Sequence, residues 1–290
     1  MFATLVPLLA RGLASWGCRP CARLRPASAG PAGAQPRQRG LGRGMACKPP
    51  ANTCSAPAPP SFTVVPCSCC DEERVMEFMQ RTFYREEPVL VAAGLAECPP
   101  QVLLDHTRAS FREGLSLMAV LQGSAGGQGD ICGVAVNSIV APGDACKLRQ
   151  QAEQADCPAT RRVLELWSLM LERPEIWSGQ DPEGCCMLEL RELATDQAVR
   201  GLGVGLQLAL AAREVAADVG APAYKIDCTS QYSGKIAEKL GMKKVFSLKY
   251  ADFLDSDGKP LFQPPCPHVE AAVYVQSMSK DCQHKFGGEL

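Results

Sequence analysis

The chain has 290 residues and a formal net charge of −1, but its charges are distributed unevenly. Residues 1–70 contain eight basic residues and no acidic one, whereas residues 71–290 contain 22 basic and 31 acidic residues and carry a net charge of −9. This acidic composition argues against a nucleic-acid partner, because nucleic-acid-binding proteins neutralise phosphates with a basic face. No window holds the roughly 18–20 consecutive apolar residues that span a bilayer, so we expect a soluble protein.

Sixteen cysteines are a high count, and seven of them lie within residues 1–70. No basic region precedes the apolar start of the chain, so a secretory signal is not formed and reduced thiols are expected. The spacings Cys18-x-x-Cys21 and Cys67-x-Cys69-Cys70 match half-sites for zinc, but the nearest histidine along the chain is residue 106. We therefore expect scattered free thiols and no metal.

The composition divides the chain into four parts. Residues 1–44 are rich in Arg, Ala, Gly, Pro and Ser, which is typical of a mitochondrial transit peptide but also of a disordered extension. The expected localisation is therefore cytoplasmic, with mitochondrial as an open alternative. Residues 45–61 are a Pro/Ala-rich linker that cannot build a core, residues 62–278 are the folded domain, and residues 279–290 are a C-terminal tail.

Hydrophobic periodicity predicts the elements of the first half of the domain. In chain order they are a strand over 62–66, a helix from Asp71 that Pro88 interrupts, a helix over 101–107, strands over 115–122 and 131–139, and helical periodicity from 147 to 171 that ends before Pro174. The two β-branched strands flank a Gly-rich turn, which indicates an antiparallel hairpin.

The second half alternates between strands and helices. The predicted elements are a strand over 185–193, a helix over 203–219, a strand over 224–228, a helix over 230–240, and strands over 245–250 and 269–275. Gly220 and Gly241 stand where a left-handed glycine often ends a helix. The order predicts one α/β domain with a mixed sheet.

A glycine-rich loop, residues 200–205 (RGLGVG), connects a predicted strand to a helix. Its glycines expose amide groups at the start of the helix, which forms an anion site suited to a pyrophosphate. A Walker loop would require Gly-Lys-Ser/Thr where Leu206 and Gln207 follow Gly205, and the spacing lacks the third glycine of a Rossmann fingerprint. The remaining pattern, Arg-x-x-Gly-x-Gly, resembles the acetyl-CoA loop of the GNAT acetyltransferases, although a simple Gly-rich turn explains it as well.

Four further segments resemble the insect-type arylalkylamine N-acetyltransferases, a family that includes dopamine N-acetyltransferase. They are 83–88 (FYREEP), 226–233 (IDCTSQYS), 237–242 (AEKLGM) and 253–268. The resemblance covers about residues 62–276 and implies the GNAT fold, a mixed central sheet flanked by helices. It also implies acetyl-CoA as cosubstrate and an arylalkylamine such as dopamine, serotonin, octopamine or tryptamine as acceptor. We expect a monomer.

Acetyl transfer to an amine requires a base, a group that stabilises the oxyanion and a proton for the departing thiolate. The resemblance implies Glu87 as the base, whose ordinary pKa of about 4.3 burial would have to raise. It implies Thr229 and Ser233 as catalytic hydroxyls, with Thr229 where the family often has serine, and Tyr232 is a competing proton donor. From the residues alone, Glu87 fits a surface acid at a helix end, and Thr229 and Ser230 fit helix caps.

The resemblance assigns cofactor binding to two backbone segments. They are Leu193, Ala194 and Thr195 along the pantetheine arm, and Arg200, Gly201, Leu202, Gly203, Val204 and Gly205 around the pyrophosphate. A bulge near residues 191–193 would splay the sheet and admit the thioester. Trp167 and His268 are candidates for the amine pocket, although an apolar stripe such as that of Trp167 more often belongs to a core.

Two alternatives to arylalkylamine acetylation stay open. A GNAT enzyme with another acyl donor or a polyamine or amino-acid acceptor has the same motifs. The second alternative is a protein that binds acyl-CoA without catalysing transfer, since Thr229 departs from the family pattern.

Overall fold

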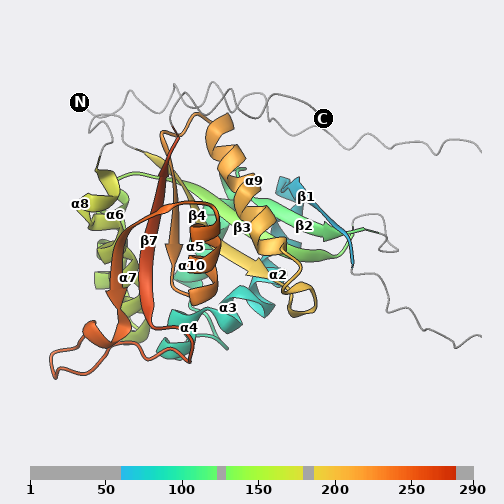
Figure 1. Cartoon of the computed structure of the whole chain (residues 1–290). Helices are drawn as coiled ribbons and strands as arrows, with labels where there is room; N and C mark the ends of the chain where they lie inside the picture. Colours follow the sequence, from blue (N-terminus) through green and yellow to red (C-terminus); the bar gives the residue numbers. More distant parts are fainter. Residues whose placement is uncertain (1–59, 123–128, 179–185, 279–290) are drawn as a thin grey trace, which may run out of the picture.

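The computed structural model describes residues 60–122, 129–178 and 186–278. A seven-stranded sheet of order β1-β2-β3-β4-β5-β7-β6 forms its centre (Figure 1). The strands are β1 (Phe62–Pro66), β2 (Leu117–Leu121), β3 (Ile131–Val140), β4 (Met187–Thr195), β5 (Ala223–Cys228), β6 (Lys243–Lys249) and β7 (Glu270–Ser277). Neighbouring strands are antiparallel except for β4 and β5, which are parallel.

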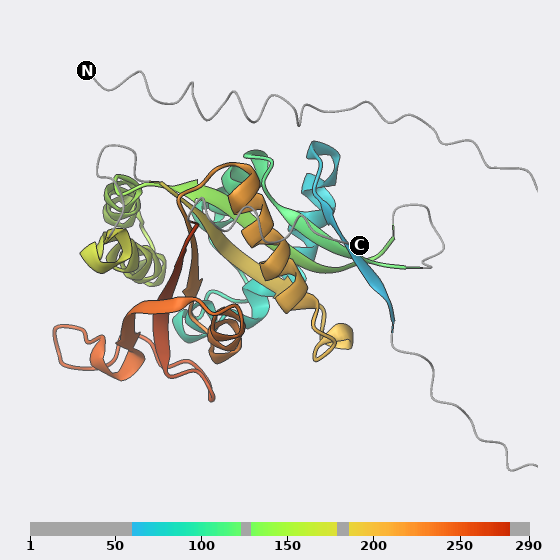
Figure 2. The ribbon, with the colours of Figure 1, turned by 45° about the horizontal axis from the view of Figure 1, so that its top comes forward.

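Helices cover both faces of this sheet. They are α2 (Glu72–Arg81), α3 (Phe83–Glu86), α4 (Pro88–Ala93), α5 (Gln101–Arg112), α6 (Asp144–Gln154), α7 (Pro158–Glu172), α8 (Pro174–Trp177), α9 (Val204–Asp218) and α10 (Gln231–Lys239), with the single-turn 3-10 helices η2 (Cys69–Asp71), η3 (Gln197–Val199) and η4 (Tyr250–Asp252). One apolar layer joins the sheet to α9 and α10, and the other joins it to α2, α4, α5, α6 and α7 (Figure 2).

Most elements lie where periodicity predicts them, including the hairpin of β2 and β3 and the helix α9, which Gly220 follows in a left-handed conformation. Three predicted helices differ from the structure. The helix predicted from Asp71 to Pro88 is divided at Thr82 into α2 and α3, and Pro88 starts α4. The helix predicted over 101–107 continues to Arg112, and the segment 147–171 is divided between α6 and α7. The division follows from the extended backbone at Ala155 and from Pro158, which starts α7 and has no amide hydrogen to donate.

Helix α9 lies unusually close to the sheet because β3 carries a glycine beneath it. A Cβ atom on Gly133 would lie 2.8 Å from Val204 Cγ1 and 2.9 Å from Leu208 Cδ1. Glycine is therefore required here for close packing, which places the start of α9 directly against β3 and β4.

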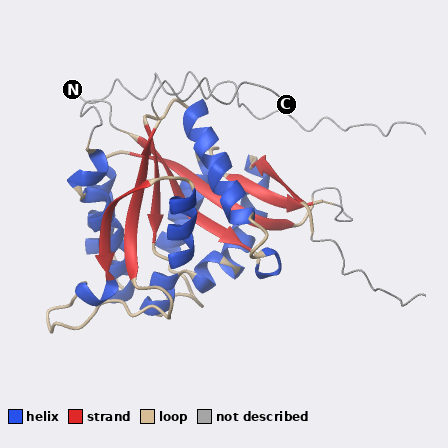
Figure 3. Ribbon diagram, viewed as in Figure 1, coloured by secondary structure: helices blue, strands red, loops and turns tan. Residues whose placement is uncertain are grey.

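The sheet opens between β4 and β5, and Figure 3 shows the strands fanning out. On β4 the register passes from Leu190 to Glu192, so Arg191 is an extra residue with no register partner on β3. The predicted bulge is therefore confirmed. Parallel pairing with β5 ends at Leu190 and Ile226, and β5 continues alongside β7 only. We call the opening between residues 191–195 of β4 and 227–228 of β5 the fork.

Candidate active site

The glycine-rich loop lies at the open end of the fork and leads into α9. Gly201 and Gly203 have φ angles of 81° and 85°, a left-handed conformation that favours glycine. A Cβ atom on either residue would contact nothing within 4 Å, so the space in front of the loop is open. Gly203 caps α9, whose first amide groups have no acceptor within the helix. A glycine-rich loop of this form at a helix start is suited to bind an anion.

The edge of β4 inside the fork offers backbone groups to a ligand. Leu193, Ala194 and Thr195 pair with β3 on one side, and in the described part of the chain no strand pairs with their other side. A Cβ atom on Gly205 would lie 3.2 Å from Ile236 Cδ1 and 3.6 Å from Thr195 Cγ2, so the start of α9 fits tightly between β4 and α10. The two predicted cofactor segments therefore border the same opening.

The acidic pair before Pro88 divides between two environments. Glu86 forms an ion pair with Arg200 of the glycine-rich loop and accepts a hydrogen bond from Gln197 Nε2 at 3.0 Å. Glu87 caps α4 and accepts a hydrogen bond through Oε2 from the amide of Leu90 at 2.6 Å. The two neighbouring carboxyl groups therefore connect the glycine-rich loop to the buried start of α4.

Glu87 is buried, with only 8 % of its surface exposed, so the interpretation of it as a surface acid is wrong. Burial raises its pKa, and the nearby Thr229 hydroxyl and the amides of Leu90 and Val89 lower it in part. Among the described residues, its Oε1 atom has no hydrogen-bond partner. This oxygen is available to a ligand.

The predicted hydroxyls lie around the start of α10 in different surroundings. Thr229 is beside Glu87, and its carbonyl oxygen accepts a hydrogen bond from the Tyr250 hydroxyl at 2.7 Å. Ser230 caps the helix by accepting a hydrogen bond from the amide of Ser233 at 3.0 Å. The Ser233 hydroxyl donates to the Ser230 carbonyl at 2.9 Å, one helical turn from Thr229. The structure thus brings Glu87 and Thr229 together, and Ser233 lies four residues after Thr229 in the chain.

Tyr232 and His268 form a separate pair at the surface. Tyr232 is 61 % exposed, and its ring meets the His268 ring edge-on with 5.5 Å between centroids. His268 Nδ1 accepts a hydrogen bond from the amide of Gln231 at 3.1 Å, and burial lowers the pKa of this histidine. Trp167 packs against the core and lies edge-on to His106. Within the described residues, no hydrogen bond joins Tyr232 or Trp167 to Glu87 or Thr229.

Sequence reasoning missed a second buried acid at the site, Glu192, which follows the bulge on β4. It is 4 % exposed and accepts a hydrogen bond through Oε1 from the Thr107 hydroxyl at 2.6 Å. Burial raises its pKa to about 7, although Thr107 and Arg191 act in the opposite direction. The available signal was the strand MLELRELAT, which carries charged residues within an apolar strand pattern.

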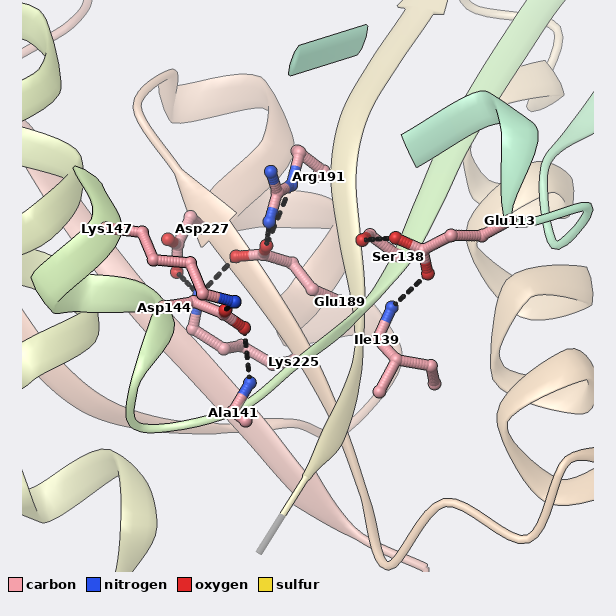
Figure 4. A network of polar contacts seen from close by, with 10 residues as sticks. All are labelled: Glu113, Ser138, Ile139, Ala141, Asp144, Lys147, Glu189, Arg191, Lys225 and Asp227. Carbon is pink, nitrogen blue, oxygen red and sulfur yellow. Dashed lines mark hydrogen bonds and ion pairs between the residues drawn. The ribbon is translucent and has the colours of Figure 1, made fainter. Parts of the chain in front are cut away.

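A buried ion cluster, comprising Glu189, Arg191, Lys225 and Asp227, closes the other end of the fork (Figure 4). Lys225 has no exposed surface and forms ion pairs with Glu189 and, at 2.7 Å, with Asp227. Arg191 contacts Glu189 at 3.0 Å. Burial alone would raise the pKa of Glu189, but its two cationic partners lower it to about 2, whereas burial raises the pKa of Asp227 to about 6. The cluster ties β4 to β5 where their pairing ends.

Other features of the described residues add no second centre. Burial raises the pKa of Cys67 and Cys228 to about 12, so these thiols are protonated at neutral pH. Within residues 60–122, 129–178 and 186–278, no group of three or more His, Cys, Asp or Glu side chains is arranged to hold a metal. Across those residues, no helix has both the length and the apolar surface needed to cross a membrane. Cys18 and Cys21 lie outside the described residues.

No protein-family model matches the sequence. Among solved structures, the chain is similar to arylalkylamine N-acetyltransferase 2 from Aedes aegypti, with 24 % identity, a TM-score of 0.69, and coverage of 75 % of this chain and 99 % of that chain. It is similar to a polyamine N-acetyltransferase from Drosophila melanogaster that forms N-acetylagmatine, with 22 % identity, a TM-score of 0.65, and coverage of 75 % of this chain and 100 % of that chain. It is also similar to an agmatine N-acetyltransferase variant in its apo form, with 21 % identity, a TM-score of 0.66, and coverage of 75 % of this chain and 99 % of that chain. The predicted fold is confirmed: this chain has the mixed α/β fold of the GNAT acetyltransferases.

Proposed function

We propose that this chain, with its GNAT fold, transfers the acetyl group of acetyl-CoA to the primary amine of an arylalkylamine such as dopamine, serotonin, octopamine or tryptamine. One observation carries the proposal: the fork has an anion-binding loop at its open end and the buried carboxyl group of Glu87 beside Thr229 within reach of its interior. A donor site and an acceptor site therefore meet at a single opening in the sheet.

The donor side fits acetyl-CoA, which supplies an activated acyl group as a thioester. The amide groups at the start of α9 and the guanidinium of Arg200 would hold the pyrophosphate. The free edge of β4 from Leu193 to Thr195 would hydrogen-bond to the pantetheine arm. The open space at Gly201 and Gly203 supports this assignment, because side chains there would occupy the path of the phosphates.

The acceptor side fits an ammonium group. In the proposed reaction a carboxylate takes one proton from the ammonium, and the amine nitrogen then attacks the thioester carbon. The C–S bond breaks, the electron pair leaves with sulfur, and the thiolate receives the second proton of the nitrogen. The hydroxyl groups of Thr229 and Ser233 would relay that proton, and the exposure of Tyr232 and its pairing with His268 speak against Tyr232 in this role.

A second acceptor class is favoured by the comparisons. Two of the similar structures carry the names agmatine and polyamine N-acetyltransferase, so an aliphatic polyamine is the alternative acceptor. The same chemistry serves both classes, and only the walls of the amine pocket would differ.

The experiment is a panel assay of the purified full chain with acetyl-CoA and dopamine, serotonin, octopamine, tryptamine, agmatine or spermidine. Release of free CoA and the mass of the acetylated product are measured. We expect turnover with at least one arylalkylamine at a higher kcat/KM than with agmatine or spermidine. The reverse order would favour the polyamine alternative, and no turnover with any amine would overturn the proposal. Longer acyl-CoA donors in the same assay test the choice of acetyl.

We also propose that residues 1–44 affect the location of the protein and take no part in its chemistry. A fusion of these residues to a fluorescent reporter tests this idea, since mitochondrial import would identify a transit peptide and diffuse cytoplasmic signal would identify a dispensable extension.

A further inference from the structure

We propose that Glu192 is a second catalytic residue of the acceptor site, where it binds the substrate ammonium together with Glu87 and accepts its proton. The inference rests on the proposed amine acetyltransfer. It changes the assignment of the base, because the family resemblance points to Glu87 alone.

Glu192 lies next to the strand segment that would hold the pantetheine arm of acetyl-CoA. It is the first residue after the bulge at Arg191 and the last before the free edge 193–195 that would hold the pantetheine arm. Its backbone pairs with Val136 on β3, and its side chain lies against α5, where Thr107 hydrogen-bonds to it. Glu87 acts on the same carboxyl group electrostatically from the start of α4.

Each of the two acids has one buried oxygen that no described residue satisfies. These atoms are Oε1 of Glu87 and Oε2 of Glu192, and each carboxyl group uses its other oxygen for a hydrogen bond to the protein. A buried carboxylate oxygen without a partner is costly. A primary ammonium provides three N–H donors and a positive charge, so it complements two such oxygens.

The hydrogen bonds behind Glu192 form a chain that suits its protonated state. The Tyr84 hydroxyl donates to the Leu103 carbonyl at 3.0 Å and lies 2.5 Å from Thr107 Oγ1, which is 2.6 Å from Glu192 Oε1. Since a carbonyl only accepts, Tyr84 donates to it and can accept from Thr107. Thr107 can then accept a hydrogen bond from a neutral Glu192.

The same chain also accommodates the ionised state. When Glu192 has lost its proton, the Thr107 hydroxyl rotates to donate to Oε1, and the Tyr84 hydroxyl turns from Leu103 to donate to Thr107 Oγ1, 2.5 Å away. Only hydroxyl hydrogens change place, while the heavy atoms stay where they are. A group that must gain and lose a proton in every turnover benefits from such a neighbourhood.

Burial raises the pKa of both acids. It raises the pKa of Glu192 to about 7, Thr107 and Arg191 lower it, and Glu87 and Glu189 raise it. Burial and the Glu192 carboxylate raise the pKa of Tyr84 on α3, which therefore stays protonated. Burial also raises the pKa of Glu87, and the Thr229 hydroxyl and the amides of Leu90 and Val89 lower it in part. In the proposed site both carboxyl groups bind the ammonium, and Glu192 exchanges the proton near neutral pH.

The step balances as follows. Ionised Glu192 takes one proton from R–NH3+ and becomes neutral, and the lone pair released on nitrogen forms the bond to the thioester carbon. Sulfur leaves with the electrons of the C–S bond and receives the second nitrogen proton, which gives the amide and CoA. Glu192 then releases its proton to water.

The test compares Glu192→Gln with wild type in kcat/KM for the amine between about pH 5 and 9. Glutamine keeps a hydrogen bond to Thr107 but cannot ionise. We expect wild type to rise through an ionisation near pH 7, and the variant to lose that ionisation and about 100-fold in kcat, with an unchanged KM for acetyl-CoA. A variant that keeps the ionisation and stays within about threefold of wild type would overturn the proposal.

Two further variants separate catalysis from structure. Thr107→Val removes a hydroxyl that lowers the pKa of Glu192, so it should move the ionisation to higher pH while leaving the reaction in place. Glu113→Gln is the matched control, because Glu113 also has a pKa raised by burial but hydrogen-bonds to Ser138 and to the amide of Ile139 on β3. It should leave the pH profile unchanged, and a profile altered as much as in Glu192→Gln would contradict a specific role.

A measurement without turnover distinguishes a failure of this inference from a failure of the proposed function. The measurement is carbon-13 NMR of the side-chain carboxyl groups, in which the Glu192 signal is assigned by its absence from Glu192→Gln. We expect the Glu192 signal to titrate near pH 7 and to shift when an amine is added. Titration near the ordinary value of about 4.5 would refute the inference even in an active enzyme. An enzyme that acetylates no amine would refute the proposed function instead.

Discussion

Glu86 on α3 forms an ion pair with Arg200 of the glycine-rich loop, 114 residues further along the chain. The next residue, Glu87, is buried beside Thr229. Two adjacent carboxylates therefore connect the loop of the proposed donor site to the acceptor site. Both partners of the ion pair are partly exposed, so it contributes at most about 1 kcal/mol and orients the loop more than it stabilises the fold.

Arg200→Ala should weaken binding of acetyl-CoA, because it removes a charge-assisted hydrogen bond to the pyrophosphate. We expect KM for acetyl-CoA to rise about 10-fold with little change in kcat, as measured by initial rates. Arg213→Ala, further along α9, is the control and should leave KM unchanged. An unaltered KM in Arg200→Ala would show that this side chain serves only Glu86.

Glu87→Gln should preserve the cap of α4, since an amide oxygen can still accept from Leu90, but it removes a carboxyl group that can ionise and pair with the ammonium. We expect the amine KM to rise about 10-fold or more with normal stability. Glu87→Ala should in addition lose about 1 kcal/mol in the free energy of unfolding, measured with urea, because the cap is lost. Equal stability of the two variants would contradict the capping role.

Gly133→Ala should disturb the packing of α9 on β3. The new methyl group would meet Val204 Cγ1 at 2.8 Å, and we expect a loss of about 1–3 kcal/mol in the free energy of unfolding together with a higher KM for acetyl-CoA. Gly143→Ala is the matched control, because its Cβ would meet nothing within 4 Å and its φ is −67°. That variant should be neutral or slightly more stable.

Lys225→Met should strongly destabilise the fold. It leaves Glu189 and Asp227 buried without their shared cation, and removal of one partner of a buried ion pair typically costs about 3–5 kcal/mol. The measurement compares the free energy of unfolding in denaturant of two variants, Lys225→Met and the double variant that also carries Glu189→Gln. The double variant should recover part of the loss, and equal losses would show that charge is not the cause.

Glu192→Gln should be more stable than wild type at alkaline pH. The pKa of Glu192 rises from 4.5 to about 7 on folding, so the unfolded chain ionises first and wild-type stability falls between these pH values. This pKa shift corresponds to a loss of about 3 kcal/mol in the free energy of unfolding of wild type above pH 7. The difference in stability between Glu192→Gln and wild type should vanish towards pH 4.5. Urea midpoints at about pH 5 and 8 measure it.

The pKa of Asp227 is raised to about 6, so its ionisation also lowers the free energy of unfolding as the pH rises. This contribution is the same in wild type and in Glu192→Gln and cancels in their difference. Glu189 affects the free energy of unfolding in the opposite direction. Its pKa is lowered to about 2, so its stabilising contribution is lost only as the pH falls below the ordinary pKa of a glutamate. A Glu192→Gln variant that is less stable than wild type at both pH values would indicate a structural carboxylate.

Local patterns account for what the sequence predicted well. The hairpin of β2 and β3 follows from alternating apolar residues on either side of a glycine-rich turn, and α9 and α10 end at Gly220 and Gly241 because both glycines adopt a left-handed conformation. Even the bulge at Arg191 was anticipated, through the family resemblance. The division of 147–171 was missed because the helical period continues across the break before Pro158.

Side-chain environments depended on the tertiary structure. Glu87 is buried and Tyr232 exposed because distant segments cover one and leave the other uncovered. The chain from Glu192 through Thr107 to Tyr84 joins residues separated by 85 and 23 positions, and no local pattern encodes it. By itself the sequence determined the elements, the anion-binding loop and the resemblance, since these depend on neighbouring residues. Only folding decided which carboxyl groups lose their water, and burial raises the pKa of Glu192 into the range where a proton can be exchanged.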